Sequence, residues 1–323
     1  MRRRDVLAGI VSTAAWSGAA LAQHALGKTS FILWVSTEAQ PDPFIAGFRE
    51  GMRERGYIEG QNLAFVLRYA PDDPGALRTM LPDILGTSAD LVVSSGPAIQ
   101  AMRAATSRTV LFAISGDPVE LGIAESLARP GRNFTGSTFM SLDVAQKRVE
   151  LLKELLPELR TLAVVSNTNH PGERSEHDAT RAVADALSIR MAYVPFSSAA
   201  ELEGALERVR ASGADALLVF PEGLTMVHRV RIAALAQSSR LASMFGWREY
   251  CDAGGLASYG ANQRAAYASL AIYADRLLRG EKPESLPIQR ASTFELVLNL
   301  RTAREMGLQV PAPLLSRADD LIE

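Results

Sequence analysis

The stretch Ser115–Gly136 has the sequence SGDPVELGIAESLARPGRNFTG, and the rest of the chain is arranged around it. Its polar start follows directly on an apolar run, and Asp117 is placed to cap the first turn of a short helix that ends at Pro130–Gly131. Asn133–Thr138 then predicts a strand that leads into a long helix. We interpret the stretch as the last loop and strand of one lobe, where the chain passes to another. An ordinary strand–loop–helix edge is the simpler alternative.

Strand and helix signals alternate on both sides of this stretch. The run 31–35 is continuously apolar, which is typical of a strand buried on both faces. Further strands are predicted at 63–69, 90–93 and 109–113, and again at 161–165, 190–195, 216–220 and 241–245. Helical segments separate the runs; in the segment 41–55, for example, Phe44, Ile45, Phe48 and Met52 share one face. The alternation predicts an α/β protein with two similar lobes, each built on a parallel sheet covered by helices.

The last third of the chain continues with a mixture of elements. We expect a helix at 226–238, a strand within 254–260, and a long helix at 261–279 that buries Tyr267. A strand at 294–298 and a short helix at 300–306 follow, and the prolines at 311 and 313 predict an extended tail.

The N-terminus has the pattern of an export signal. Arg3 and Arg4 precede an apolar segment, Val6–Leu21, that is shorter than the roughly 20 residues of a membrane-spanning helix. Ala20–Ala22 matches a small-x-small cleavage site, and residue 23 is Gln, so we expect no lipid anchor. The pattern predicts a twin-arginine signal peptide over residues 1–22, cleaved after Ala22, and a periplasmic protein. An uncleaved membrane anchor is the alternative.

Charge and composition exclude several function classes. The formal net charge is −2, and removal of the signal with its three arginines and one aspartate leaves −4. Because no basic cluster lies outside the signal, nucleic acid is not an expected partner. The single cysteine, Cys251, predicts an incidental buried residue. The sequence has neither a glycine-rich dinucleotide fingerprint nor a phosphate loop, and no metal-ligand spacing, so we predict no cofactor and no metal.

Polar loops follow the strands of the first lobe. In parallel sheets ligands bind beyond the carboxyl ends of the strands, where the loops 36–38, 94–98 and 115–118 should converge. Ser95 and Gly96 lie at a predicted helix start, whose free N–H groups would suit a ligand carboxylate. Plain helix capping is the alternative for each loop taken alone.

A second set of loops follows the strands of the second lobe, at Asn167, Pro221–Glu222 and 246–250. Two lobes with facing loops would enclose a cleft. Trp247 could stack on a ligand there, and Glu249 could accept a hydrogen bond from an ammonium or hydroxyl group. Packing in the core is the alternative for Trp247.

Several longer stretches carry a family resemblance: GFREGMRERGYIEGQNLAF, SSGPAIQA, GDPVELGIAESLARPGRNFTG, KRVELLKELLPEL, WREYCDAGGLASYG and FELVLNLRTAREMGLQVPAPLLSRADDLIE. Over nearly its whole mature length the chain resembles the ABC transporter substrate-binding proteins of the tryptophan/tyrosine-uptake type. The resemblance implies the type I periplasmic binding protein fold, with two Rossmann-like lobes joined by three crossing segments, for which our candidates are 135–142, 255–262 and a third near 286–293. It places the first lobe at 28–138 plus 262–288 and the second at 139–261 plus 289–323.

The resemblance also implies a function and a site. It predicts a monomeric solute-binding protein, not an enzyme, that captures a small carboxylate-bearing ligand, an amino acid or aromatic compound, and delivers it to a membrane permease with a cytoplasmic ATPase. The implied ligand-binding residues are Ser36, Thr37, Ser95, Gly96, Pro97, Gly116, Asp117, Asn167, Pro221, Glu222, Trp247, Glu249 and Tyr259. The loops after Asn167 and at Phe220–Glu222 depart from the family pattern, so the identity of the ligand does not transfer. A ligand-binding sensory protein and a cleft enzyme with Asp117 or Glu249 as general base are the alternatives.

Overall fold

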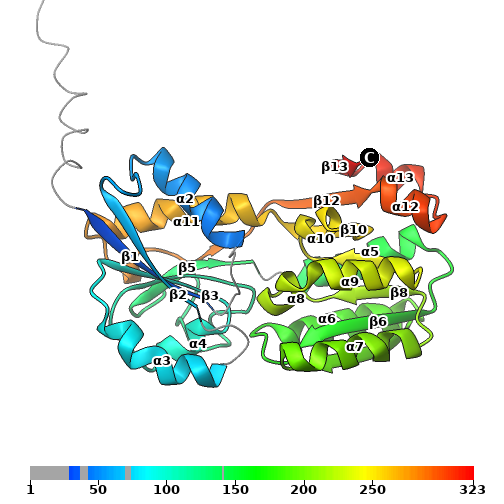
Figure 1. Cartoon of the computed structure of the whole chain (residues 1–323), viewed down its shortest axis with the longest axis horizontal. Coiled ribbons are helices and arrows are strands. Elements are labelled where there is room, and N and C mark those ends of the chain that lie inside the picture. Colours follow the sequence, from blue (N-terminus) through cyan, green and yellow to red (C-terminus); the bar gives the residue numbers. More distant parts are fainter. Residues whose placement is uncertain (1–28, 37–42, 70–73, 140–141) are drawn as a thin grey trace, which may run out of the picture.

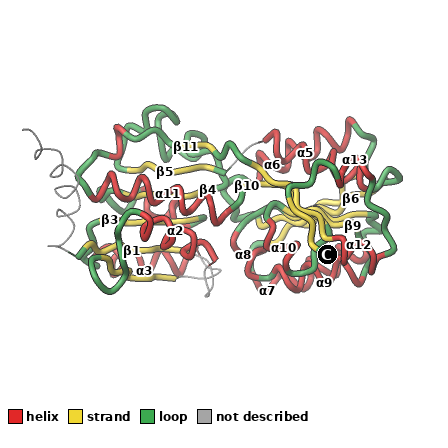
Figure 2. The backbone as a smooth tube through the Cα atoms, turned by 90° about the horizontal axis from the view of Figure 1, so that it is seen from above, coloured by secondary structure: helices red, strands yellow, loops and turns green. Residues whose placement is uncertain are grey.

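The structure is a computed structural model that describes residues 29–36, 43–69, 74–139 and 142–323. The predicted signal peptide and Thr37 lie outside the described residues. The described chain forms two layered bodies that lie side by side along the long axis of the molecule, which is horizontal in Figure 1. Seen from above, the strands fall into two separate groups, each surrounded by helices (Figure 2).

The first sheet is parallel throughout, as expected for strands that are apolar on both faces. The described residues give it six strands in the order β11-β5-β4-β3-β1-β2. The strands are β1 (Ser30–Ser36), β2 (Leu63–Tyr69), β3 (Leu91–Ser95), β4 (Val110–Ile114), β5 (Phe134–Thr138) and β11 (Gln289–Arg290). Every residue of β3, β4 and β5 is buried.

The second sheet repeats the arrangement of the first. Among the described residues it has seven strands in the order β13-β12-β10-β9-β8-β6-β7. They are β6 (Thr161–Asn167), β7 (Arg190–Phe196), β8 (Ala216–Val219), β9 (Ala242–Phe245), β10 (Ala257–Ala261), β12 (Phe294–Asn299) and β13 (Asp320–Ile322). The five strands β6 to β10 have the same order as β1 to β5, which confirms the predicted α/β architecture of two similar lobes.

One strand of the second sheet departs from the parallel prediction. β12 pairs with β10 in the antiparallel direction. β10 ends at Ala261, where the chain leaves for the first lobe, and β12 begins at Phe294, where it returns. Because both strands meet the same crossing region, β12 must run back along β10 in the opposite direction.

Helices cover both faces of each sheet. In the first lobe α2 (Pro43–Glu54) and α11 (Gln263–Leu278) bury apolar residues on one face, and α3 (Pro74–Gly86) and α4 (Ala98–Arg103) on the other. A 3₁₀ turn at Pro283–Ser285 follows α11. The helices of the second lobe are α5 (Leu142–Leu155), α6 (Glu173–Ala186), α7 (Ala199–Ala211), α8 (Gly223–Val227), α9 (Arg229–Ser238), α10 (Arg248–Asp252), α12 (Leu300–Met306) and α13 (Ala312–Leu315). Within the described ranges, none of the helices is long and apolar enough to span a bilayer.

Several local predictions were wrong. The helix expected after Asp117 is a set of turns, because Gly122 adopts a positive φ of 64° and takes the chain out of the helical region. The helix expected at 226–238 is divided at His228 into α8 and α9. The tail is not extended: it forms α13 and then β13, which completes the second sheet.

The sheets are linked between β5 and α5, between β10 and α11, and between β11 and β12. β11 pairs with β5, so the third link begins after Arg290, beyond the lobe boundary at 288 that we expected. The links fall within or next to the three expected crossing segments. The division into lobes that move independently stays a prediction.

Two glycines bring α2 and α11 into direct contact in the first lobe. A Cβ atom at Gly47 would overlap the carbonyl oxygen of Arg264, and one at Gly51 would overlap that of Ala268. The two glycines are one turn apart and face the same neighbour. Their spacing therefore fixes α11, which begins at the second link, firmly to the first lobe.

We predict that Gly51→Ala destabilises the protein by about 1–3 kcal/mol, because the added methyl group forces the two helix backbones apart. Urea unfolding followed by circular dichroism measures the change. Gly86→Ala is the matched control: a Cβ there meets nothing within 4 Å, so its stability should stay within about 1 kcal/mol of wild type. Equal midpoints for Gly51→Ala and wild type would contradict the close approach.

Candidate functional site

A small cavity lies where the carboxyl ends of strands from the two sheets face each other. In the first lobe its lining comes from the carboxyl ends of β3 and β4, from the loops after β3, β4 and β5, and from helices α2 and α11. In the second lobe it comes from the segments that follow β6, β8 and β9. The lining residues are Phe44, Ser95, Gly96, Pro97, Ala113, Ile114, Ser115, Phe139, His170, Pro171, Glu222, Gly223, Trp247, Gln263 and Tyr267. The topology therefore produces an interlobe site, as expected for facing parallel sheets.

Aromatic rings from both lobes meet at this cavity. Trp247 of the second lobe packs edge-on against Phe44 of the first, with ring centroids 5.6 Å apart and an interplanar angle of 82°. Phe44 stacks on Tyr267 at 5.0 Å and 9°. Phe139, next to the first link, contacts Tyr267 at 5.8 Å. Trp247 is 5% exposed, so its ring is enclosed by this cluster.

The cavity is nearly shut. Its volume is about 30 Å³, which is enough for one or two water molecules, whereas ligand cavities usually measure about 300–1,000 Å³. A groove of about 840 Å³ lies outside it and shares Pro97 and Pro171 with its lining. The cavity as it stands therefore has no room for a ligand the size of an amino acid.

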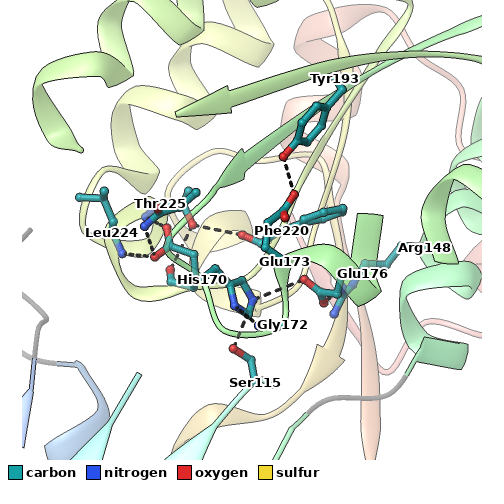
Figure 3. Close-up of polar contacts among 12 residues, drawn as sticks. Ser115, Arg148, His170, Gly172, Glu173, Glu176, Tyr193, Phe220, Leu224 and Thr225 are labelled. Atoms are coloured by element: carbon teal, nitrogen blue, oxygen red, sulfur yellow. Dashed lines mark hydrogen bonds and ion pairs between the residues drawn. The ribbon is translucent and has the colours of Figure 1, made fainter. Parts of the chain in front are cut away.

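A buried polar network connects the lobes beside the cavity (Figure 3). The Oγ atom of Ser115 in the first lobe lies 3.3 Å from Nε2 of His170 in the second. The Nδ1 atom of His170 accepts a hydrogen bond from the backbone N–H of Gly172 at 2.8 Å, so the proton of the neutral ring lies on Nε2. The same Nε2 atom is 3.5 Å from Oε2 of Glu176.

The network ends on a buried arginine. Arg148 lies 3.4 Å from Glu176 and donates from Nε to the carbonyl oxygen of Tyr259 at 2.8 Å. Burial lowers the pKa of Arg148, and the Glu176 carboxylate opposes this shift. The ion pair of Arg148 with Glu176, together with the contacts of Glu176 and Gly172 to the imidazole, fixes the position of His170 at the cleft.

Five predicted ligand-binding residues line the cavity: Ser95, Gly96, Pro97, Glu222 and Trp247. Ser36 and Asn167 lie behind them, since Ser95 donates to Ser36 at 3.2 Å and Asn167 donates to Glu222 at 3.2 Å. Gly116 faces Pro171 of the opposite lobe, and Pro221 packs against Gly246.

Glu222 and Asp117 have structural partners. The carboxylate of Glu222 is 6% exposed, caps α8 by accepting from the N–H groups of Leu224 and Thr225, and also accepts from Asn167. Asp117 accepts from the N–H groups of Val119 and Glu120. It lines a separate cavity of about 110 Å³.

Glu249 and Tyr259 are not among the residues that line the interlobe cavity. Burial raises the pKa of Glu249, and the neighbouring Asp252 and Glu295 carboxylates add to the shift, so this side chain faces other acidic groups. Tyr259 supplies its backbone carbonyl to Arg148, and its ring tilts against Phe294 of β12.

Sequence reasoning missed several lining residues. Phe44 and Tyr267 were assigned to the buried stripes of their helices, and only the tertiary structure shows that these stripes extend to the opposite lobe. His170 gave no signal beyond its place in a loop after a strand. Gln263 stands at the start of a predicted helix, where its burial is not visible in the sequence.

The described part of the chain gives little support to a reactive thiol or a metal site. Burial raises the pKa of the Cys251 thiol to about 12, which fits the predicted inert buried residue. The described residues bring no three His, Cys, Asp or Glu side chains together in a way that could hold a metal ion.

Comparisons with known proteins agree with this geometry. The sequence model of the family described as "ABC transporter substrate binding protein" matches residues 32–322. A tyrosine-binding protein of Clostridioides difficile (strain R20291) is 23% identical over 266 residues, which cover 81% of this chain and 76% of the relative. Periplasmic binding proteins are among the solved structures that share the fold.

Two solved structures of substrate-binding relatives share the fold. An ABC domain from Streptococcus pneumonia in complex with L-Trp superposes with a TM-score of 0.83, at 24% identity, over 91% of this chain and 100% of its own. A ligand-free, open substrate-binding protein with adhesive properties from Clostridium difficile gives a TM-score of 0.63, at 19% identity, over 91% of this chain and 99% of its own. Both structures share the two-lobed fold of this chain.

A glycine at the lobe contact offers a test of closure. A Cβ atom at Gly172, the N-cap of α6, would lie 2.8 Å from the carbonyl oxygen of Ser115 and 3.4 Å from Cα of Gly116, both in the opposite lobe. Its φ of −95° suits any residue.

We predict that Gly172→Val holds the lobes apart and exposes Trp247, which acrylamide quenching of tryptophan fluorescence measures. Trp34 is fully buried in β1 and should stay protected. Global stability should change by no more than about 1 kcal/mol, because the closest contact of the added atoms, at 2.8 Å, is with the backbone of the other lobe, and their neighbour within the same lobe is the edge of the His170 ring, 3.0 Å away. Gly204→Val is the control, since a Cβ there approaches only the end of the Arg208 side chain. Unchanged quenching in Gly172→Val would contradict the contact.

Proposed function

The chain belongs to the family of ABC transporter substrate-binding proteins, and we propose that it captures an aromatic α-amino acid in the cleft between its lobes. The observation that carries this proposal is the aromatic cluster of Phe44, Tyr267 and Trp247. It contributes rings from both lobes to one small cavity, so an aromatic side chain inserted there would gain contacts on each side. The tyrosine-binding relative and the L-Trp-bound structural neighbour support the same ligand class.

The charges around the cavity favour a ligand with an ammonium group. Glu222 is the one acidic side chain of the described lining, and that lining contains no lysine or arginine. A carboxylate would instead meet neutral donors such as Ser95, Gln263 and the N–H groups at the start of α4. That helix has six residues, so its dipole contributes little to anion binding. We therefore infer that the carboxylate bonds to neutral donors, at positions that include the predicted Ser95–Pro97 segment.

Export and delivery complete the proposal. We propose that residues 1–22 are a twin-arginine signal, cleaved after Ala22, and that the protein is periplasmic; the N-terminal sequence pattern and the family support this. A permease and its ATPase would receive the ligand from a monomer of this chain.

A sensory role is the second candidate, and loss of amino-acid uptake in cells that lack the protein would favour transport over sensing. The cleft enzyme is less well supported, because Asp117 caps a turn and Glu249 lies away from the cavity.

We predict that isothermal titration calorimetry shows binding of L-tryptophan or L-tyrosine with a dissociation constant on the order of 1 µM or tighter, about −8 kcal/mol. L-alanine, which lacks the ring, is the control ligand and should bind far more weakly. Trp247→Phe should weaken the binding of the aromatic ligand about two- to tenfold, which is the size expected for one aromatic contact. The absence of binding for both aromatic amino acids would overturn the proposed ligand class.

A further inference from the structure

Gln263 is a buried polar side chain at the proposed ligand cavity. It is the first residue of α11, it is 2% exposed, and it lines the interlobe cavity. Neither Nε2 nor Oε1 of its amide has a hydrogen-bond partner in the described part of the chain. Burying an amide without partners costs free energy, and native structures rarely keep such a group without a reason.

The helix itself does not need this side chain. Asn262 already caps α11, because its Oδ1 atom accepts a hydrogen bond from the N–H of Ala265 at 3.0 Å. Three other polar side chains of the lining have partners in the structure: Ser95 bonds to Ser36, Ser115 to His170, and Glu222 to the start of α8. The Gln263 amide is thus available for a group that enters the cavity.

The Gln263 amide lies close enough to the aromatic cluster to contact the head group of a ligand whose ring binds there. Gln263 and Tyr267 are four residues apart on α11, so they are neighbours on one face of the helix, with Cβ atoms about 5–6 Å apart. Tyr267 stacks on Phe44, which contacts Trp247. A ligand ring among these side chains would place its α-carbon, one methylene away, within reach of the amide.

We propose that Gln263 binds the zwitterionic head group of the amino acid, an inference that rests on the proposed function. Its Oε1 atom accepts a hydrogen bond from the α-ammonium group, and its Nε2 group donates to the α-carboxylate. One neutral amide thereby satisfies both charged groups of an α-amino acid, and Glu222 at the same cavity adds attraction for the ammonium. A ligand that carries only one of the two charged groups bonds to only one of the two polar groups of the Gln263 amide.

The test compares ligands and variants by calorimetry. The ligands are L-tryptophan, tryptamine, which has only the ammonium, and indole-3-propionate, which has only the carboxylate. Gln263→Met keeps the length of the side chain and removes both hydrogen-bonding groups, and Gln263→Glu keeps the acceptors but loses the amide donor and adds a negative charge. Gln61→Met, the same exchange at an exposed site, is the matched control.

We expect Gln263→Met to weaken L-tryptophan binding about ten- to hundredfold, the loss typical of a hydrogen bond to a charged group. The loss for tryptamine and for indole-3-propionate should be smaller. Gln263→Glu should weaken indole-3-propionate much more than tryptamine, because it places a negative charge next to the carboxylate. Gln61→Met should bind L-tryptophan like the wild type.

Two results would overturn the assignment of Gln263 while leaving the proposed function intact. One is wild-type affinity for L-tryptophan in Gln263→Met. The other is an equal loss for all three ligands in both variants, which would indicate a packing role. If the wild-type protein binds neither L-tryptophan nor L-tyrosine, the proposed ligand class fails, and the assignment of Gln263 fails with it.

Discussion

The contact between Phe44 and Trp247 is the interaction on which the closed arrangement of the two lobes depends. It joins α2 of the first lobe to the loop after β9 of the second, and Tyr267 supports it from α11. Each aromatic pair contributes about 0.5–1.5 kcal/mol beyond its buried area. A bound ligand must replace these contacts with its own. It therefore shifts the equilibrium toward the bound form only as far as its affinity for that form exceeds its affinity for the other. An aromatic ligand can replace these aromatic contacts at the lowest cost in free energy. The cluster therefore indicates an aromatic ligand.

The surrounding structure holds the two halves of this contact in place. Gly47 and Gly51 let α2 and α11 touch, so that Phe44 and Tyr267 belong to one rigid unit of the first lobe. In the second lobe, the chain of contacts from Arg148 through Glu176 to His170 fixes the loop that faces Ser115. The lobes thus meet through an apolar contact on one side of the cavity and a polar contact on the other. Both must break when the cleft opens.

The sequence predicted the fold in most respects, because parallel strands buried on both faces leave long apolar runs such as 31–35 and 161–165. It also led to Trp247 and Glu222, which follow such strands in loops. It failed where tertiary contacts decide: Phe44 and Tyr267 resemble ordinary core residues of their helices, and Glu249 follows a strand like Trp247 but faces Asp252 and Glu295 instead of the cavity. Local turn chemistry at Gly122 removed a predicted helix. The partners of Gln263 and Gly172 lie far away in sequence, so no local pattern could reveal them.

The central claim is that the ligand enters only when the lobes separate, and a reversible cross-link between them tests it most directly. A Cβ atom at Gly116 would lie 3.1 Å from Cβ of Pro171 in the other lobe, close to the 3.5–4.5 Å that a disulfide needs. The native Cys251 is buried and does not compete. In the variant with Gly116→Cys and Pro171→Cys, we expect the oxidised protein to bind no L-tryptophan and the reduced protein to regain binding. Equal association rates and affinities in the oxidised and reduced forms would contradict the account.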